Sequence, residues 1–270
     1  MSILAASLLL ALQPTYAAGS PITVGVEIEV AQGEDERVLN VVLPESFEDN
    51  SDRKFPVVIL LDGGRQQWLL DAASAFARSA RRRHAQEVIL VGIDTTGRRR
   101  FDLTPPMRAK LEVDPEHEGG GGAPEFRAWL AGKAIPLIEN QFRGNGQVFL
   151  IGHSLGGLFA LETLGDHVLT VSGVAAISPA LWWDEDAPLH RLVATLPTSD
   201  DLPPIFVAVA DEDPDLMRSV ITLKDSLSGH DLLCFEDRAQ QNHGTIVPSV
   251  LLQIGPCLWP VPPAPPNEAE

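Results

Sequence analysis

The chain has 270 residues and a formal net charge of −17, from 20 basic and 37 acidic residues (20 − 37 = −17). That charge would repel nucleic acid and anionic membranes, and the 44% of apolar residues is enough for a core and excludes a disordered acidic protein. Two cysteines exclude a disulfide scaffold and a four-cysteine zinc site, so the composition indicates a soluble globular domain, most simply an enzyme.

The first element in chain order is an apolar run at residues 3–12, which is too short to span a bilayer. Small residues follow it, and a signal peptidase could cut after Ala17 or Ala18. Residues 1–18 are therefore predicted to be the signal peptide of a periplasmic or secreted protein. No basic residue precedes the run, and the alternative is a short buried helix in a cytoplasmic protein.

Alternating apolar and polar residues predict two half-buried strands next, at 22–30 and 37–43. Beyond them, apolar runs typical of strands buried on both faces alternate with helical stretches. The further predicted strands are 56–61, 87–93, 147–151, 171–177, 204–210 and 231–235. The predicted helices are 67–83, 124–142, 155–164, 215–228 and 245–258.

This order of elements predicts an α/β fold with a mostly parallel central sheet and helices on both faces. No internal repeat or linker interrupts the middle of the chain, so 19–259 is expected to be one domain and the proline-rich, then acidic residues 260–270 an unpacked tail. The longest irregular stretch, 98–122, is expected over the carboxyl ends of the strands, where ligands bind. Cys234 and Cys257 could form a disulfide if the protein is exported.

The strongest chemical motif is Gly152-His153-Ser154-Leu155-Gly156, which reads G-x-S-x-G between a predicted strand and a predicted helix. A nucleophilic serine needs this setting, because it sits at a tight corner with strained backbone angles and small neighbours. The N-terminus of the following helix also favours developing negative charge. Ser154 is therefore the predicted nucleophile, and the alternative is an ordinary serine in a glycine-rich turn.

A serine at such a turn needs a histidine that takes its proton and a carboxylate that fixes the histidine tautomer. Of the histidines after Ser154, only His243 lies between the last predicted strand and the last helix, at the sheet edge of the serine. His243 is therefore the predicted base.

The acid is expected directly after the strand 204–210, which leads into an acidic turn. We prefer Asp213, with Asp211 second, because a few residues are needed to clear the strand end. In the same turn Asp215 is expected as a helix N-cap and Glu212 as a solvated side chain.

The oxyanion hole is predicted to use the backbone N–H of Leu155 together with an N–H from the glycine loop after strand 56–61. Gly64 is the candidate in that loop, because glycine allows close approach of the backbone to a substrate. No two histidines show metal-ligand spacing, so neither a metal nor another cofactor is expected.

Several further blocks of sequence follow one another between about residues 38 and 243. They are 57–63 (VVILLDG), 91–93 (VGI), 102–105 (DLTP), 122–123 with Phe126 ahead of 135–138, 152–161 (GHSLGGLFAL) and 177–184 (ISPALWWD). With these blocks the chain resembles the putative-esterase branch of the α/β-hydrolase superfamily. That branch includes enterobactin and salmochelin esterases and, more distantly, S-formylglutathione hydrolases.

The resemblance implies the α/β-hydrolase fold and an ester hydrolase in which Ser154 is the nucleophile and His243 the base. The family's acid follows a strand-end glycine by three positions, and Ala210 stands at that place, which points to Asp213. Some members of the family resemble dyads, so the site without an acid stays open.

The resemblance also implies substrate contacts. An arginine-rich stretch before the DLTP block contacts anionic substrate in siderophore-cleaving relatives, which implies a substrate-binding role for Arg99. The alternative is that the arginines at 98–100 are a solvated run of charges. Phe101 stands where those relatives have an arginine, and this departure puts a catecholate substrate in doubt. Trp182 and Trp183 are expected at the pocket rim, with a place in the core as the alternative.

We therefore expect a metal-independent serine esterase that acts on a small-molecule ester through an acyl-enzyme. An acyltransferase with the same residues is the alternative among enzymes, and a non-catalytic binding protein that keeps the fold is the alternative of another class. The sequence predicts neither the substrate nor the oligomeric state.

Overall fold

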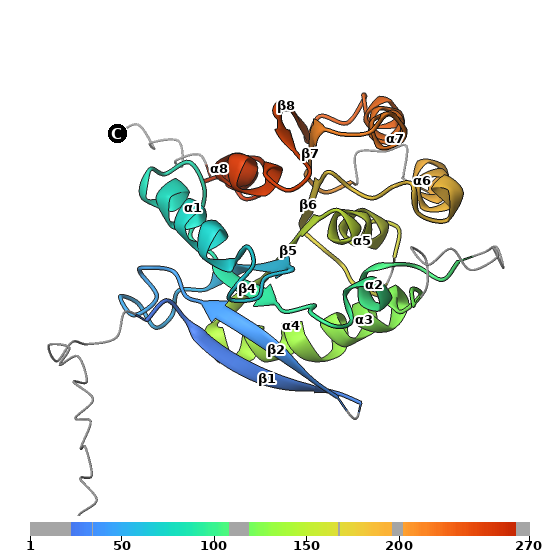
Figure 1. Cartoon of the computed structure of the whole chain (residues 1–270). Coiled ribbons are helices and arrows are strands. Elements are labelled where there is room, and N and C mark those ends of the chain that lie inside the picture. The colour runs from blue at the N-terminus through green and yellow to red at the C-terminus, as the bar shows by residue number, and fades with distance from the viewer. Residues whose placement is uncertain (1–22, 34, 108–118, 167, 196–201, 263–270) are drawn as a thin grey trace, which may run out of the picture.

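The computed structural model describes residues 23–33, 35–107, 119–166, 168–195 and 202–262. The predicted signal peptide 1–18 and most of the predicted tail 260–270 lie outside these residues. Figure 1 shows the described part as a single sheet with helices on both of its faces.

The strands form one eight-stranded sheet in the order β1-β2-β4-β3-β5-β6-β7-β8. They are β1 Val26–Gln32, β2 Asp35–Val42, β3 Phe55–Leu61, β4 Ile89–Ile93, β5 Gly144–His153, β6 Gly173–Ile177, β7 Ile205–Asp211 and β8 Leu233–Asn242. β2 pairs antiparallel with β1 and with β4, and every other neighbouring pair is parallel. The predicted mostly parallel sheet with an antiparallel start is confirmed.

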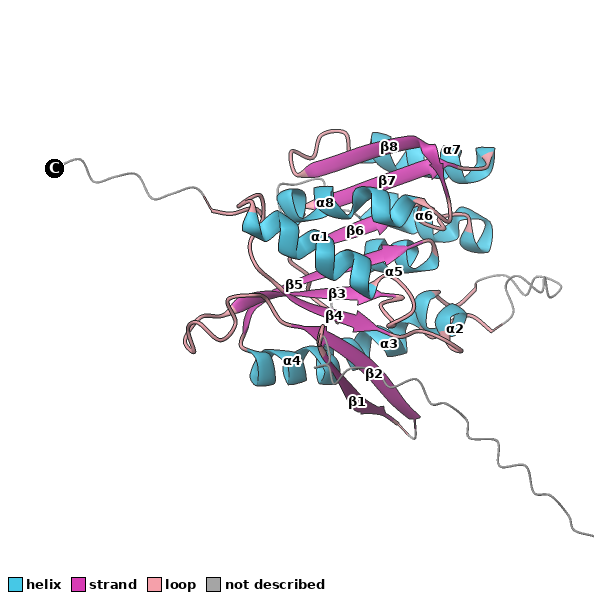
Figure 2. Ribbon diagram, turned by 60° about the vertical axis from the view of Figure 1, so that its left-hand side comes forward, coloured by secondary structure: helices cyan, strands magenta, loops and turns pink. Residues whose placement is uncertain are grey.

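The helices are α1 Leu69–Arg81, α2 Arg99–Leu103, α3 Ala123–Trp129, α4 Ile135–Phe142, α5 Leu155–Thr163, α6 Trp183–Thr195, α7 Pro214–Ser226 and α8 Ile246–Leu258. α1 and α8 pack side by side on one face of the sheet (Figure 2). The apolar residues of α3 to α7 belong to the core on the opposite face. Both faces are thus covered, as predicted, because parallel strands need crossover connections that return over the sheet.

β3 illustrates why the central strands have continuous apolar sequences. All seven of its residues are buried. Side chains alternate across a strand, so Val57 and Ile59 join the core beneath α3 to α7, whereas Val58 and Leu60 join the core beneath α1 and α8. A polar side chain at any of these positions would be buried in one core or the other.

The predicted helix 124–142 is divided into α3, a π-helical turn at Leu130–Ala134 and α4. Pro136 has no N–H for the helix ladder, and the N–H of Ile135 bonds to the carbonyl of Leu130, five residues back. The apolar periodicity that predicts the helix continues through this turn, so the sequence shows one helix where the structure has two.

α6 has no predicted counterpart. Residues 184–186 in its first turn have left-handed backbone angles, and Pro188 follows them. The segment therefore lacks the start pattern and the periodicity by which a helix is predicted.

β8 extends to Asn242, beyond the predicted end at residue 235. It is the edge strand of the sheet, and its second half is largely polar and exposed, so the apolar signal stops before the strand does. A disulfide between Cys234 and Cys257, with 6.3 Å between the Cα atoms, ties this edge strand to α8.

Candidate active site

Ser154 occupies a sharp turn between β5 and α5. Its φ of 58° and ψ of −117° are strained for a residue with a side chain. The strand and the helix touch at this turn, because a Cβ added to Gly152 would lie 2.1 Å from the carbonyl oxygen of Gly156. Ser154 N–H donates to the carbonyl of Ile177 at 2.9 Å, which fixes the turn to β6. This geometry is that of the turn predicted from the glycine–serine motif.

His243 follows the end of β8 and is oriented by a carboxylate. Its Nδ1 lies 2.9 Å from Oε1 and 3.0 Å from Oε2 of Glu212. The Glu212 side chain is 5% exposed and that of His243 is 41% exposed. This pairing holds the proton on Nδ1 and leaves Nε2 as the acceptor nitrogen.

The register between β7 and β8 explains the pair. The last residues matched across the two parallel strands are Asp211 and Asn242, after a bulge in β8. The next residue along each chain is Glu212 on one side and His243 on the other, so the two side chains meet just beyond the strand ends.

The imidazole of His243 reaches the serine turn. Its ring centroid is 4.5 Å from that of His153, the residue directly before Ser154. In the part of the chain that the structure describes, no hydrogen bond joins the Ser154 hydroxyl to His243. Such contacts are often long before substrate binds and shorten in the reacting complex.

Two loops provide the candidate oxyanion donors. Leu155 is the first residue of α5, so its N–H has no acceptor within the helix. The N–H of Gly64, in the loop after β3, donates to Oε1 of Gln67 at 2.9 Å. The flexible Gln67 side chain therefore accepts the hydrogen bond of the second candidate donor. This side chain has to move away before the N–H of Gly64 can bind an oxyanion.

Arg99, at the start of α2, lies beside these loops with its side chain 35% exposed. Its guanidinium bonds to the carboxylate of Asp62 and to the carbonyl of His153. These contacts engage Nε and Nη2 of the guanidinium, two of the three nitrogens that could otherwise bind a substrate anion.

Residues 31–223 match the family model described as putative esterase. The chain belongs to the putative esterase family. The matched span includes Ser154 and Glu212, whereas His243 lies beyond its end.

Two curated relatives of this family member are siderophore esterases. The siderophore enterobactin esterase of Emericella nidulans is 32% identical over 152 residues, which cover 50% of each chain. The siderophore triacetylfusarinine C esterase of Aspergillus fumigatus is 29% identical over 193 residues, covering 67% of this chain and 62% of the relative. The match thus spans between half and two thirds of the relatives' own length.

Solved structures show the same fold. An IroE-like serine hydrolase from Shewanella oneidensis matches with a TM-score of 0.73 and 26% identity, covering 86% of this chain and 78% of that one. The BES protein from Bacillus cereus matches with a TM-score of 0.77 at 23% identity, covering 90% and 99%, and supports the fold alone. The resemblance and the α/β-hydrolase fold predicted from the sequence are both confirmed.

In this putative esterase, Asp213 is not the carboxylate that meets the histidine. Its Oδ1 accepts the N–H groups of Asp215 and Leu216 at 2.9 and 3.0 Å, so it is the N-cap of α7. Asp215, the predicted cap, is exposed, and Glu212, predicted to be solvated, is buried against His243. A signal for the cap was present, because Asp213 precedes a proline, which favours the first helical position.

The two tryptophans predicted at the pocket rim differ in their burial. Trp183 is fully buried in the core beneath α3 to α7, which is the alternative that the sequence left open for it. A Cβ on Gly120 would lie 2.7 Å from its ring, which shows how closely the backbone at Gly120 approaches it. Trp182 is half-buried at the edge of the same core and stays a candidate for the pocket rim.

The imidazole of His153 lies beside that of His243 and is neutral. Burial, followed by the nearby His243 and Arg99, lowers the pKa of His153 to about 4, although Asp62 opposes the shift. Its Nε2 is buried and finds no hydrogen-bond partner among the described residues. Trp68 contacts the ring edge-on at 6.3 Å between centroids. His153 therefore stays uncharged at neutral pH beside the imidazole of His243.

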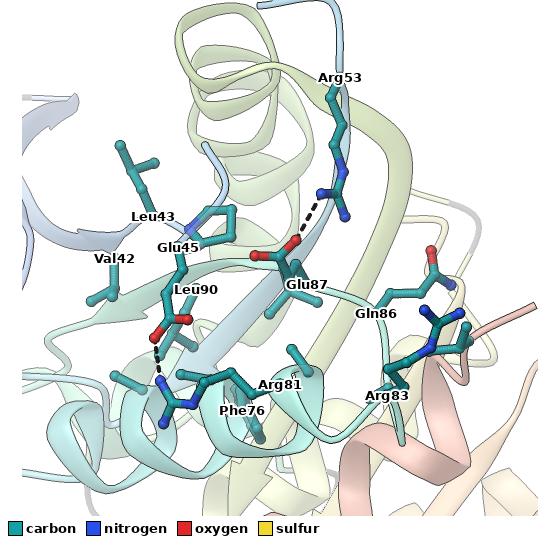
Figure 3. Close-up of a pocket in the computed structure, with 17 residues that line it drawn as sticks. Val42, Leu43, Glu45, Arg53, Phe76, Arg81, Arg83, Gln86, Glu87 and Leu90 are labelled. Atoms are coloured by element: carbon teal, nitrogen blue, oxygen red, sulfur yellow. Dashed lines mark hydrogen bonds and ion pairs between the residues drawn. The ribbon is translucent and has the colours of Figure 1, made fainter. Parts of the chain in front are cut away.

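A cavity of about 450 Å³ lies at the other end of the strands. Figure 3 shows the residues that line it. It is bordered by Val42 at the end of β2 and by Arg53 and Glu87, which precede β3 and β4. Its charged side chains form the ion pairs Arg53–Glu87 and Arg81–Glu45. The cavity is thus separate from the serine turn, which lies at the carboxyl ends of the strands.

The described residues contain no group of three or more histidine, cysteine or acidic side chains that could bind a metal ion. No helix within them combines the length and the apolar character that crossing a bilayer needs.

Proposed function

We propose that the protein is a serine hydrolase that cleaves a carboxylic ester through an acyl-enzyme intermediate. The observation that supports this most directly is the pairing of His243 with the buried carboxylate of Glu212 beside the strained turn of Ser154. Membership of the putative esterase family supports the reaction class independently of this geometry.

In the acylation step, Ser154 Oγ attacks the ester carbonyl carbon while Nε2 of His243 takes the hydroxyl proton. Glu212 accepts a hydrogen bond from Nδ1–H and stabilises the imidazolium. The carbonyl oxygen becomes negative and accepts the N–H of Leu155 and, once Gln67 has moved away, that of Gly64. The bond to the alcohol oxygen then breaks, and the alcohol leaves with the proton from His243.

In the second step, Nε2 of His243 takes a proton from water, and the resulting hydroxide attacks the acyl carbon. The acid leaves, and Ser154 regains its proton from His243. The same residues would transfer the acyl group to an alcohol if an alcohol replaced water, so an acceptor alcohol belongs in the assay.

A siderophore ester is the first substrate class to test, because the two curated relatives are named for enterobactin and triacetylfusarinine C. Phe101, where the resemblance implies an arginine, and the engagement of Arg99 by Asp62 argue against recognition of a catecholate by this segment. A panel with both siderophores and simple neutral esters would rank these classes.

A fluorophosphonate probe tests the proposal. We expect one label per molecule in the wild type and none in Ser154→Ala, measured by intact mass, with Ser178→Ala as a serine control that keeps the label. Labelling of Ser154→Ala to the same extent as the wild type would refute the nucleophile.

We further propose that the protein is exported. The Cys234–Cys257 disulfide supports this, because such bonds persist in oxidising compartments. N-terminal sequencing of the protein from its native host should begin at residue 18 or 19, and a chain that retains its first residues would contradict the proposal.

A further inference from the structure

Asp62 and Arg99 form an ion pair at the point where the site's loops meet. Asp62 directly follows β3, has a left-handed φ of 54° and is 4% exposed. The Nε of Arg99 lies 2.9 Å from both carboxylate oxygens, and Nη2 lies 2.8 Å from Oδ2. Thr95, in the loop after β4, donates its hydroxyl to the same carboxylate.

The pair also reaches the serine turn. Nη2 of Arg99 donates to the carbonyl oxygen of His153 at 3.2 Å, one residue before the nucleophile. The carboxylate of Asp62 lies against the first turn of α5, because a Cβ on Gly156 would be 3.8 Å from Oδ2. One ion pair therefore connects the ends of β3, β4 and β5 with α2.

These contacts matter because the two candidate oxyanion donors come from different loops. Gly64 follows Asp62 by two residues, and Leu155 follows His153 by two residues. The pair therefore connects Asp62, two residues before Gly64, to His153, two residues before Leu155. A planar guanidinium that makes several bonds at once fixes such a distance better than a single contact would.

We propose that Arg99 and Asp62 are positioning residues that set the separation of the two oxyanion donors, an inference that rests on the proposed esterase function. The buried carboxylate of Asp62 needs the guanidinium, and the guanidinium is held away from substrate by it. The pair acts on the transition state of any ester, whatever the charge of the substrate.

The opposing interpretation is that Arg99 binds an anionic substrate. A matched pair of substrates distinguishes this interpretation from the positioning role. The substrates are p-nitrophenyl butyrate, which is neutral, and p-nitrophenyl hemisuccinate, which carries a carboxylate. The variants are Asp62→Asn, which keeps the side-chain size, Arg99→Gln, which is shorter and removes the charge, and the double variant. Arg218→Gln, a change at an exposed arginine of α7, is the control.

We expect Arg99→Gln and Asp62→Asn each to lower kcat about 10- to 100-fold on both esters, with KM changed by less than about threefold, because small displacements of aligned groups are costly. The double variant should be little worse than either single one, since both remove the same contact. Arg218→Gln should match the wild type.

Anion binding would give a different result. Arg99→Gln would raise KM for the hemisuccinate alone, and Asp62→Asn would release Arg99 and lower that KM. Either result overturns the positioning role. Arg99→Lys, which keeps the charge but not the planar fork, should lose kcat to an intermediate extent and serves if the Gln variant does not fold.

Fluorophosphonate labelling separates failure of this inference from failure of the proposed function. Wild-type protein that is neither labelled nor active would remove both. Labelled, active wild type with variants of unchanged kcat would remove the positioning role alone.

Discussion

The charged side chains at the two ends of the parallel strands differ in how deeply they are buried. At the amino ends, the pairs Arg53–Glu87 and Arg81–Glu45 border a cavity but are partly or largely exposed, where each contributes about 0–1 kcal/mol. At the carboxyl ends there is a strained serine, a neutral, half-buried histidine and two carboxylates with buried side chains, Asp62 and Glu212. The difference teaches that strained backbone and buried charged groups mark the proposed active site, whereas the cavity does not.

The largest expected effect tests this contrast directly. Ser154→Ala should lower kcat on an ester on the order of 10⁴-fold or more, because the nucleophile is lost. Ala77→Phe, which places a ring in the cavity at the amino ends, should keep kcat and KM within about twofold of the wild type. Steady-state assays of both variants measure these effects. A comparable loss of kcat in Ala77→Phe would contradict our assignment of the active site to the carboxyl ends of the strands.

The second test compares adjacent carboxylates. Glu212→Gln should lower kcat about 10²- to 10⁴-fold, because the tautomer and the charge of His243 are no longer supported. Asp213→Ala should leave kcat near the wild type but lower the free energy of unfolding by about 0.5–2 kcal/mol, because it removes the cap of α7. Kinetics and urea unfolding of the two proteins measure this, and exchanged phenotypes would restore Asp213 as the acid.

The third test concerns pH. The native pKa of His153 is about 4, below its ordinary value of 6.5, so between these values the unfolded chain binds a proton that the native protein does not. Stability should therefore fall as the pH drops through this window, by at most about 3 kcal/mol from this group. His153→Phe should remove that component, measured as a smaller difference in unfolding free energy between about pH 7 and pH 4.5. An equal pH dependence in both proteins would show that the ring is not protected from protonation.

The smallest effect is expected at the cavity. Arg81→Gln should change the unfolding free energy by less than about 1 kcal/mol, because its pair with Glu45 is exposed. Activity should stay at the wild-type level. A change in kcat or in ester specificity would mean that the cavity communicates with the serine turn.

Much of the fold was predictable because its signals are local. The apolar runs identify the central strands, and the order of strands and helices leaves few arrangements other than a mostly parallel sheet. The second half of β8 and the whole of α6 were not predicted, because an exposed edge strand and a helix with an irregular first turn have no such local pattern.

By itself, the sequence determined the serine turn, the fold family and the placement of His243 near the serine, since each depends on motif and order along the chain. Only the tertiary structure decided that Glu212 meets His243, that Asp213 caps a helix and that Arg99 bonds to Asp62. These contacts depend on the register between β7 and β8 and on loops that converge from distant parts of the chain. A shift of one residue exchanges one carboxylate for the next, and the proline after Asp213, although it indicates the helix cap, does not specify which carboxylate meets the histidine.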